Sequence, residues 1–97
     1  MLDKMKQLME VKRQAEQLKK ELDASSIEVS DTPGIRIVIN GSQNFISLDI
    51  EDQLLTSENK NKIRSDLLRN LNAAIKRSQI LAAEKMRSMT GLNIPGL

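Results

Sequence analysis

Apolar positions recur with a helical period at both ends of the chain and with a period of two between them. In the first segment the spacing is three and four residues in turn, at Leu8, Val11, Ala15, Leu18 and Leu22. At 100° per residue these side chains fall within an arc of about 80°, which is close to a coiled-coil seam. The surrounding Leu, Lys, Gln and Glu residues, with no Gly or Pro, also favour a helix. We predict a long helix over residues 1–24 that packs along one side only.

Residues 26–51 follow the period of a β-sheet, in which alternate side chains share a face. The aliphatic positions are Ile27, Val29, Ile35, Ile37, Ile39, Ile46, Leu48 and Ile50. They predict a three-stranded antiparallel meander with one aliphatic face. Val38 and Phe45 have the opposite parity, so we expect the second face not to be wholly polar.

Two turn signals separate the predicted strands. Thr32-Pro33-Gly34 places Pro and Gly at the two central positions of a turn. In the segment 40–44, Gly41 is expected to take a positive φ at little cost.

A second long helix is predicted over residues 57–90. Thr56 or Ser57 can cap its first turn, and Gly91 and Pro95 can end it, which leaves residues 91–97 as a loosely held tail. Its apolar residues span an arc of roughly 140° on the helical wheel. These residues are Ile63, Leu67, Leu71, Ala74, Ile75, Leu81, Ala82, Met86 and Met89.

The three segments define an α+β protein in which residues 1–97 form one domain. A chain of 97 residues with one aromatic residue supplies a thin core, so self-association is expected. There is no Cys and therefore no disulfide, which fits a reducing cytosol. Residues 1–22 have no apolar stretch typical of a secretory signal, and we expect a cytoplasmic protein without membrane contact.

Charge is segregated along the chain although the net charge is only +2. Residues 1–22 carry six basic and four acidic side chains. Residues 23–52 carry one basic and six acidic side chains, and residues 57–90 carry eight basic and three acidic side chains. Clustered Lys and Arg indicate a surface that binds a polyanion.

Each predicted helix places a row of basic residues nearly opposite its apolar seam. We call these rows the basic ridges; they are the candidate DNA-binding residues Lys6, Arg13 and Lys20 in the first helix, and Lys62, Arg69, Lys76 and Arg87 in the second. Charges opposite a seam are also what any solvated helix shows. The second ridge exceeds that expectation, because the segment 57–90 that contains it has eight bases and only three acidic residues to pair with them.

Catalytic chemistry is poorly represented. The chain has no His or Cys and no phosphate-loop or nucleophile-elbow motif, so we expect no catalytic residue, cofactor or small-molecule substrate. Asp49 and Glu51 share a strand face and leave a metal-dependent phosphoryl hydrolase as a third alternative, although their spacing matches no known metal loop. One aromatic residue cannot form a stacking platform for single strands, which leaves duplex DNA bound through phosphates.

The order of several short motifs resembles the YbaB/EbfC family of bacterial nucleoid-associated DNA-binding proteins. After the Lys-rich helix come Ile35-Arg36-Ile37-Val38-Ile39-Asn40-Gly41, Ile46-Ser47-Leu48-Asp49-Ile50, Leu54-Leu55, Asn72-Ala73-Ala74, Glu84-Lys85-Met86 and Thr90-Gly91-Leu92 with Pro95-Gly96-Leu97. The resemblance implies a homodimer with projecting helices and DNA binding on the nucleoid. The chain departs from it by lacking a Gly-rich stretch near the N-terminus and by having Asp31-Thr32-Pro33-Gly34 before the second strand.

The sequence therefore predicts a homodimer that binds double-stranded DNA with weak or no sequence selectivity, in chromosome organisation and gene regulation. The alternative is a dimeric adaptor without DNA binding, which docks a partner protein on exposed Leu2, Met5, Met9 or Ile80.

Overall fold

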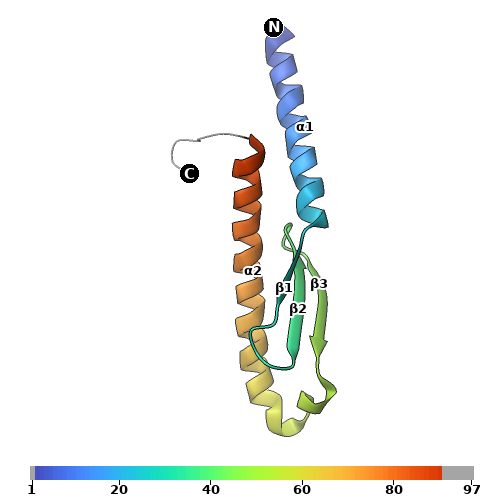
Figure 1. The fold of residues 1–97 in the computed structure, drawn as a ribbon, viewed down its shortest axis with the longest axis vertical. Helices are drawn as coiled ribbons and strands as arrows, with labels where there is room; N and C mark the ends of the chain where they lie inside the picture. The colour runs from blue at the N-terminus through green and yellow to red at the C-terminus, as the bar shows by residue number, and fades with distance from the viewer. Residues whose placement is uncertain (1, 91–97) are drawn as a thin grey trace.

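In the computed structural model, one long helix packs beside a small sheet and a second long helix extends beyond the end of that sheet (Figure 1). The structure describes the backbone of residues 2–90 and the side chains of residues 2–88. The elements are α1 (Leu2–Ala24), β1 (Ser26–Val29), β2 (Ile35–Asn40), β3 (Phe45–Ile50) and α2 (Lys60–Thr90). The molecule measures 67 × 24 × 16 Å, because α1 continues the long axis beyond the sheet. The predicted helix–meander–helix order is confirmed. The predicted tail over residues 91–97 and the side chain of Met89 lie outside the described residues.

The sheet is an antiparallel meander in the order β1-β2-β3. Ile37 of β2 lies between Val29 of β1 and Leu48 of β3, so these three side chains share one face. The turn before β2 follows the predicted chemistry: Gly34 has φ 83°, and the Ile35 amide donates to the Thr32 carbonyl at 3.4 Å. A Cβ at Gly34 would also lie 2.3 Å from the Leu54 Cδ1 atom, so a larger residue would both strain the backbone and displace the Leu54 side chain.

The predicted parity of Phe45 is wrong. The register of β2 and β3 shifts between Val38 and Ile39, which places Phe45 opposite Ile39 rather than on the polar face. A bulge inserts one extra residue into a strand and so changes which face the following side chains occupy. The inner face of β3 therefore carries Phe45 as well as Leu48.

The predicted role of Gly41 is also wrong. Gln43, with φ 65°, has the positive φ in this turn, and Gly34 is the one glycine with a positive φ in the described part of the chain. Gly41 is instead required by close approach. Its amide donates to the Leu22 carbonyl at 2.9 Å, and a Cβ would lie 2.9 Å from Leu22 Cδ2 and 3.0 Å from Leu22 O. The turn thereby contacts the end of α1.

The core lies between α2 and the first two strands. The buried apolar side chains are Val29, Ile35, Ile37, Ile39 and Ala74. On α2, the buried residues are spaced four apart, at Asp66, Asn70, Ala74 and Ser78. Of the apolar arc predicted for this helix, only Ala74 is fully buried among the residues whose side chains are described. Small and polar side chains thus form the line of closest contact between α2 and the sheet.

Polar contacts attach α2 to both turns of the meander. Asn70 Nδ2 donates to Thr32 Oγ1 at 2.6 Å, and Ser78 Oγ donates to the Asn40 carbonyl at 2.7 Å. Asn70 Oδ1 is buried without a hydrogen-bond partner. Because these contacts lie near opposite ends of β2, they fix the direction of α2 along the strand.

The seam of α1 is covered only near its C-terminal end. Leu18 and Leu22 are half-buried, whereas Leu8 is 70% and Val11 63% exposed. α1 contains no buried residue, and its N-terminal half projects beyond α2 (Figure 1). The structure thus agrees with a helix that packs along one side, but over only half its length.

The second helix begins three residues later than predicted. Residues Ser57–Asn59 form a 3-10 turn, and Lys60 is the first residue of α2. Thr56 caps this turn, because its Oγ1 accepts a hydrogen bond from the Asn59 amide at 3.3 Å.

Replacing Gly41 by Ala should destabilise the protein by about 1–2 kcal/mol, because the added methyl group overlaps Leu22. The control is Gln43→Gly in the same turn, which relieves a positive φ and should leave stability within about 0.5 kcal/mol. Urea unfolding followed by circular dichroism measures both variants. Equal stability of the Gly41→Ala variant and the parent chain would contradict the close approach.

Candidate nucleic-acid interface

All seven candidate DNA-binding residues have exposed side chains on the outward side of their helices. On α1 these are Lys6, Arg13 and Lys20, and on α2 they are Lys62, Arg69, Lys76 and Arg87. On α2 they extend from residue 62 to residue 87, which corresponds to about 37 Å at 1.5 Å per residue. That length is close to the roughly 34 Å of one turn of B-DNA.

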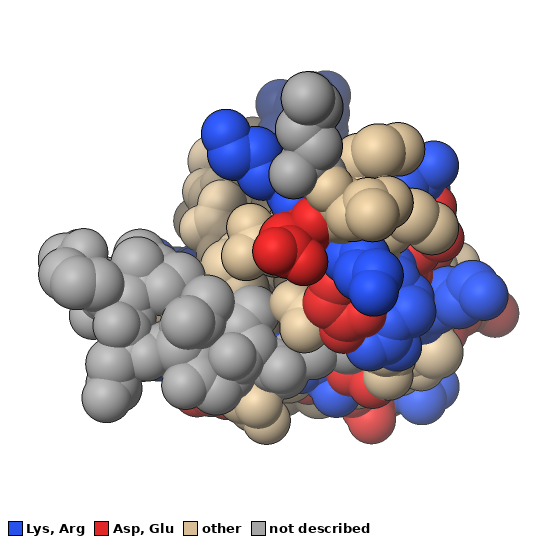
Figure 2. Space-filling model, turned by 90° about the horizontal axis from the view of Figure 1, so that it is seen from above, with Lys and Arg blue, Asp and Glu red and all other residues tan. Residues whose placement is uncertain are grey.

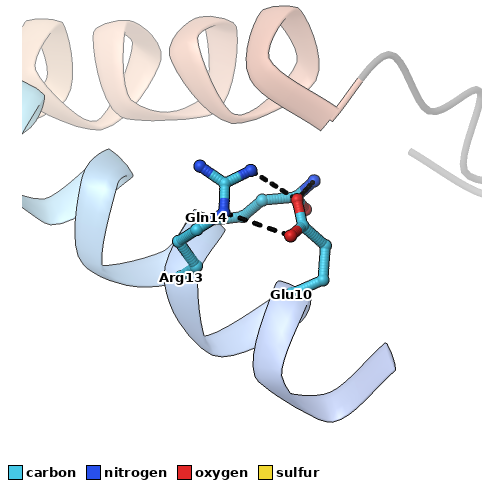
Figure 3. A network of polar contacts seen from close by, with 3 residues as sticks. All are labelled: Glu10, Arg13 and Gln14. Carbon is cyan, nitrogen blue, oxygen red and sulfur yellow. Dashed lines mark hydrogen bonds and ion pairs between the residues drawn. The ribbon is translucent and has the colours of Figure 1, made fainter. Parts of the chain in front are cut away.

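Arg13 is held by a carboxylate of its own helix. Its Nε donates to Glu10 Oε2 at 3.1 Å, and Gln14 Nε2 donates to Glu10 Oε1 at 3.4 Å (Figure 3). The hydrogen bond from Arg13 lowers the pKa of Glu10 from its ordinary value of 4.5, and the same bond raises the pKa of Arg13. The pair is therefore charged at neutral pH, and a phosphate must compete with Glu10 for Arg13.

Lys62 is also paired. Its Nζ lies 2.7 Å from Asp66 Oδ2, and the Asp66 residue is only 8% exposed. The other five candidates have no hydrogen bond or ion pair within the part of the chain that the structure describes. These are Lys6, Lys20, Arg69, Lys76 and Arg87. Five of the seven ammonium and guanidinium groups can thus approach a phosphate without first breaking a protein contact.

The two ridges do not form one surface within a protomer. α1 contacts α2, and the half-buried residues in these parts of the helices are Gln14, Leu18 and Leu22 on α1 and Leu81, Ala82 and Lys85 on α2. Each ridge lies on the opposite side of its helix from this contact, so the ridges face away from each other. Viewed from the α1 end, Lys and Arg side chains accordingly occur on more than one side of the molecule, with carboxylates between them (Figure 2).

Two other arginines are used to hold the fold. Arg77 donates to both carboxylate oxygens of Asp31, at 3.1 and 2.7 Å, and so ties α2 to the turn after β1. Arg36 pairs with Glu28 across β1 and β2, and it lies opposite Asp49 of β3. Both therefore neutralise part of the acidic middle segment.

Further exposed bases lie outside the ridges. They are Lys4, Lys12 and Lys19 on α1, and Lys60 and Arg64 in the first turns of α2. A helical wheel places the α1 group near the seam and therefore against a packing partner. The structure shows instead that residues 2–13 of α1 are all exposed among the residues that it describes, so bases on the seam side are as accessible as those on the ridge. The spacing of the apolar seam along α1 did not predict that the bases near the seam would be exposed.

The outer face of the sheet is acidic and unsuited to phosphate. Glu28 and Asp49 lie on it with Arg36 between them. An open hollow of about 550 Å³ at the end of the sheet is lined by Asp49 and Glu51 together with the turn residues 32–34. Among the described residues, no group of three or more His, Cys, Asp or Glu side chains is placed to hold a metal ion.

The structure thus defines a class of small helix–sheet–helix proteins whose long helices present basic ridges to solvent. The model of the YbaB/EbfC DNA-binding family matches residues 1–93, and this chain belongs to that family. The family is one of DNA-binding proteins and not an enzyme family.

Relatives of similar length carry the name nucleoid-associated protein. The one from Pelotomaculum thermopropionicum is 30% identical over 95 residues, covering 96% of this chain and 90% of the relative. The one from Clostridium kluyveri is 32% identical over 97 residues, covering 96% and 83%. The one from Prochlorococcus marinus strain MIT 9515 is 32% identical over 96 residues, covering 95% and 82%. Within residues 2–90, no helix is long and apolar enough to cross a membrane.

Replacing Glu10 by Gln should strengthen duplex binding, because it frees the Arg13 guanidinium for a phosphate. One added phosphate contact would steepen the slope of log affinity against log salt by up to about 0.9. Glu16→Gln is the matched control, since it removes the same charge from an exposed position of α1 that has no contact with Arg13. Fluorescence anisotropy with a labelled duplex measures both slopes, and identical slopes for the two variants would show that Glu10 does not restrain Arg13.

Proposed function

We propose that this chain binds double-stranded DNA as a homodimer, mostly through phosphates and with weak or no sequence selectivity. Its role is chromosome organisation and gene regulation. The observation that carries the proposal is the pair of ridges, five of whose residues have no partner in residues 2–90. Because the chain belongs to a DNA-binding family, we take DNA to be the polyanion that the ridges bind.

The character of the ridges favours phosphate contacts over base reading. Lys and Arg that recur every seven or eleven residues along one side of a helix are placed to contact the phosphate backbone rather than the base edges in a groove. The chain offers Phe45 alone for base stacking, and that side chain belongs to the sheet. Affinity should therefore depend strongly on salt and weakly on sequence.

A second copy is favoured by the arrangement of the charges and by the size of the core. The ridges of one protomer face away from each other, so a single duplex cannot contact both in one protomer at once. Among residues 2–88, whose side chains the structure describes, only five apolar side chains are fully buried, which is a small core. A homodimer would add apolar burial and would present two copies of each ridge.

The names of the relatives support a location on the nucleoid, within the cytoplasm. The high concentration of double-stranded DNA on the nucleoid favours binding by a protein that contacts phosphates without selecting a sequence.

A second candidate function is docking of a partner protein. Exposed apolar side chains on the projecting part of α1 favour it: Leu2 is 75%, Met5 62% and Met9 70% exposed. Ile80 on α2 is 52% exposed. Recovery of a stoichiometric protein after nuclease treatment, together with no binding to naked duplex, would favour the adaptor over the DNA-binding protein.

Charge reversal on the ridges should weaken binding to every duplex alike. The test variant is Arg13→Glu with Arg69→Glu, one residue in each helix. The loss of the Arg69 contact, and of the part of a contact that Arg13 makes in competition with Glu10, predicts a salt slope lower by between about 0.9 and 1.8, whatever the DNA sequence. Mobility shifts with three unrelated duplexes measure it.

The matched control is Lys12→Glu with Lys60→Glu, which changes the net charge equally at exposed positions outside the ridges. Its salt slope should fall by less than half as much. Equal losses in both double variants would contradict a ridge-specific interface. A loss on one duplex only would make Arg13 and Arg69 base readers, and no binding by the parent chain at low salt would overturn the proposed function.

A further inference from the structure

The turn between β2 and β3 contains the pair of residues most prone to spontaneous chemical change. Asn40-Gly41 is the one Asn-Gly pair in the sequence, and the other six asparagines precede a residue with a side chain. In an Asn-Gly pair the glycine nitrogen can attack the side-chain carbonyl of the asparagine. The reaction is favoured because no Cβ hinders the approach and because the glycine backbone turns freely.

Both groups that would react are held by the end of α1, which lies beside this turn (Figure 1). The Gly41 amide donates to the Leu22 carbonyl at 2.9 Å, and Asn40 Nδ2 donates to the Asp23 carbonyl at 3.4 Å. Carbonyls in the last turn of a helix lack the usual intrahelical partner, so the turn caps α1. Asn40 is 6% exposed and Gly41 is buried. While α1 is docked, the attacking nitrogen is therefore bound to Leu22.

The side-chain carbonyl of Asn40 is polarised by contacts that do not involve α1. Its Oδ1 accepts hydrogen bonds from the backbone amides of Ser42 at 3.0 Å and Asn44 at 2.9 Å. Two backbone donors at such distances stabilise the negative charge that develops on an oxygen when a nucleophile adds to its carbon. The backbone of Asn40 is also held by α2, because the Ser78 hydroxyl donates to its carbonyl at 2.7 Å. Release of α1 alone would thus free the nitrogen of Gly41 and leave the carbonyl polarised.

We propose that Asn40 is a site of spontaneous deamidation that the docking of α1 controls. When the end of α1 leaves the turn, the Gly41 nitrogen gives its proton to a base in solution and attacks Asn40 Cγ. A C–N bond forms, the Cγ–Nδ2 bond breaks, and Nδ2 takes up a proton and leaves as ammonia. The product is a cyclic succinimide. Water then opens either of its two carbonyls, which leaves aspartate or isoaspartate at position 40.

The product disfavours a return to the docked state. A carboxylate accepts hydrogen bonds but has no proton to donate, so the bond to the Asp23 carbonyl is lost. The new negative charge also lies close to the Asp23 carboxylate, which accepts a hydrogen bond from the Ser42 hydroxyl of the same turn. Burying an unpaired charge is costly. Deamidation therefore keeps α1, with its basic ridge, released from the sheet, and the modification records past release of this helix.

The rate of deamidation at Asn40 tests this control in the full chain. The protein is kept at mildly alkaline pH below its unfolding transition, and mass spectrometry of its peptides measures the two products. Leu22→Ala removes a half-buried side chain that packs on Gly41. It should raise the rate about tenfold or more, because the rate follows the population of the released form. Leu8→Ala is the matched control at a position of α1 that is 70% exposed, and it should leave the rate unchanged.

Leu67→Ala separates release of α1 from unfolding of the whole chain. Leu67 packs against the buried core, about 16 Å along α2 from Ser78. Its truncation destabilises the fold without touching the end of α1, so Asn40 should react close to the parent rate. Equal acceleration by Leu22→Ala and Leu67→Ala would overturn the proposal. So would a parent chain that deamidates as fast as a synthetic peptide of residues 36–46, from which it should differ at least about tenfold.

Asn40→Asp tests the effect of the product on α1. Amide hydrogen exchange in the last two turns of α1 should be about tenfold faster in this variant than in the parent chain. Asn44→Asp places the same charge on an exposed side chain of the same turn and should exchange like the parent. Equal exchange in the two variants would contradict a role for Asn40 in docking α1. Neither measurement involves DNA, so failure of the proposed function leaves this test unaffected.

Discussion

The close packing of α2 on β1 and β2 is the constraint on which the rest of the molecule depends. Residues four apart on α2 are buried against the sheet, and Asn70 and Ser78 bind the turns at the two ends of β2. Since a buried polar group without its partner costs about 1–3 kcal/mol, these contacts hold the helix in one direction and one rotation. That rotation determines which α2 residues face solvent, and so it sets the position of the basic ridge.

The same packing explains what the fold leaves open. Because α2 covers only β1 and β2, the inner face of β3 stays apolar and partly exposed. Because α2 is longer than the sheet, it also carries basic residues past the end of the sheet. α1 is held near its C-terminal end, where Leu22 packs on Gly41 and Asp23 accepts hydrogen bonds from Asn40 and Ser42, and its N-terminal half projects beyond α2. Apolar and basic surfaces therefore lie on different sides of α2.

Local patterns predicted the elements, because the spacing of Ile35, Ile37 and Ile39 or of the α1 seam depends only on neighbouring residues. Contacts between distant residues could not be predicted. The bulge that moves Phe45 to the inner face depends on how β3 pairs with β2, and the need for Gly41 depends on Leu22, far earlier in the chain. For the DNA site, a helical wheel orients each ridge relative to its own seam. It does not show that the two ridges face opposite directions.

We propose that duplex DNA lies along the basic ridges and away from the sheet. The most direct measurement is an NMR titration of the isotope-labelled protein with a random-sequence duplex of about three helical turns, at low salt and again at raised salt. Our account predicts shifts at Lys6, Lys20, Arg69 and Lys76 that disappear as salt increases, with none around Asp49. Shifts confined to the outer face of the sheet, or shifts that salt does not reverse, would contradict it.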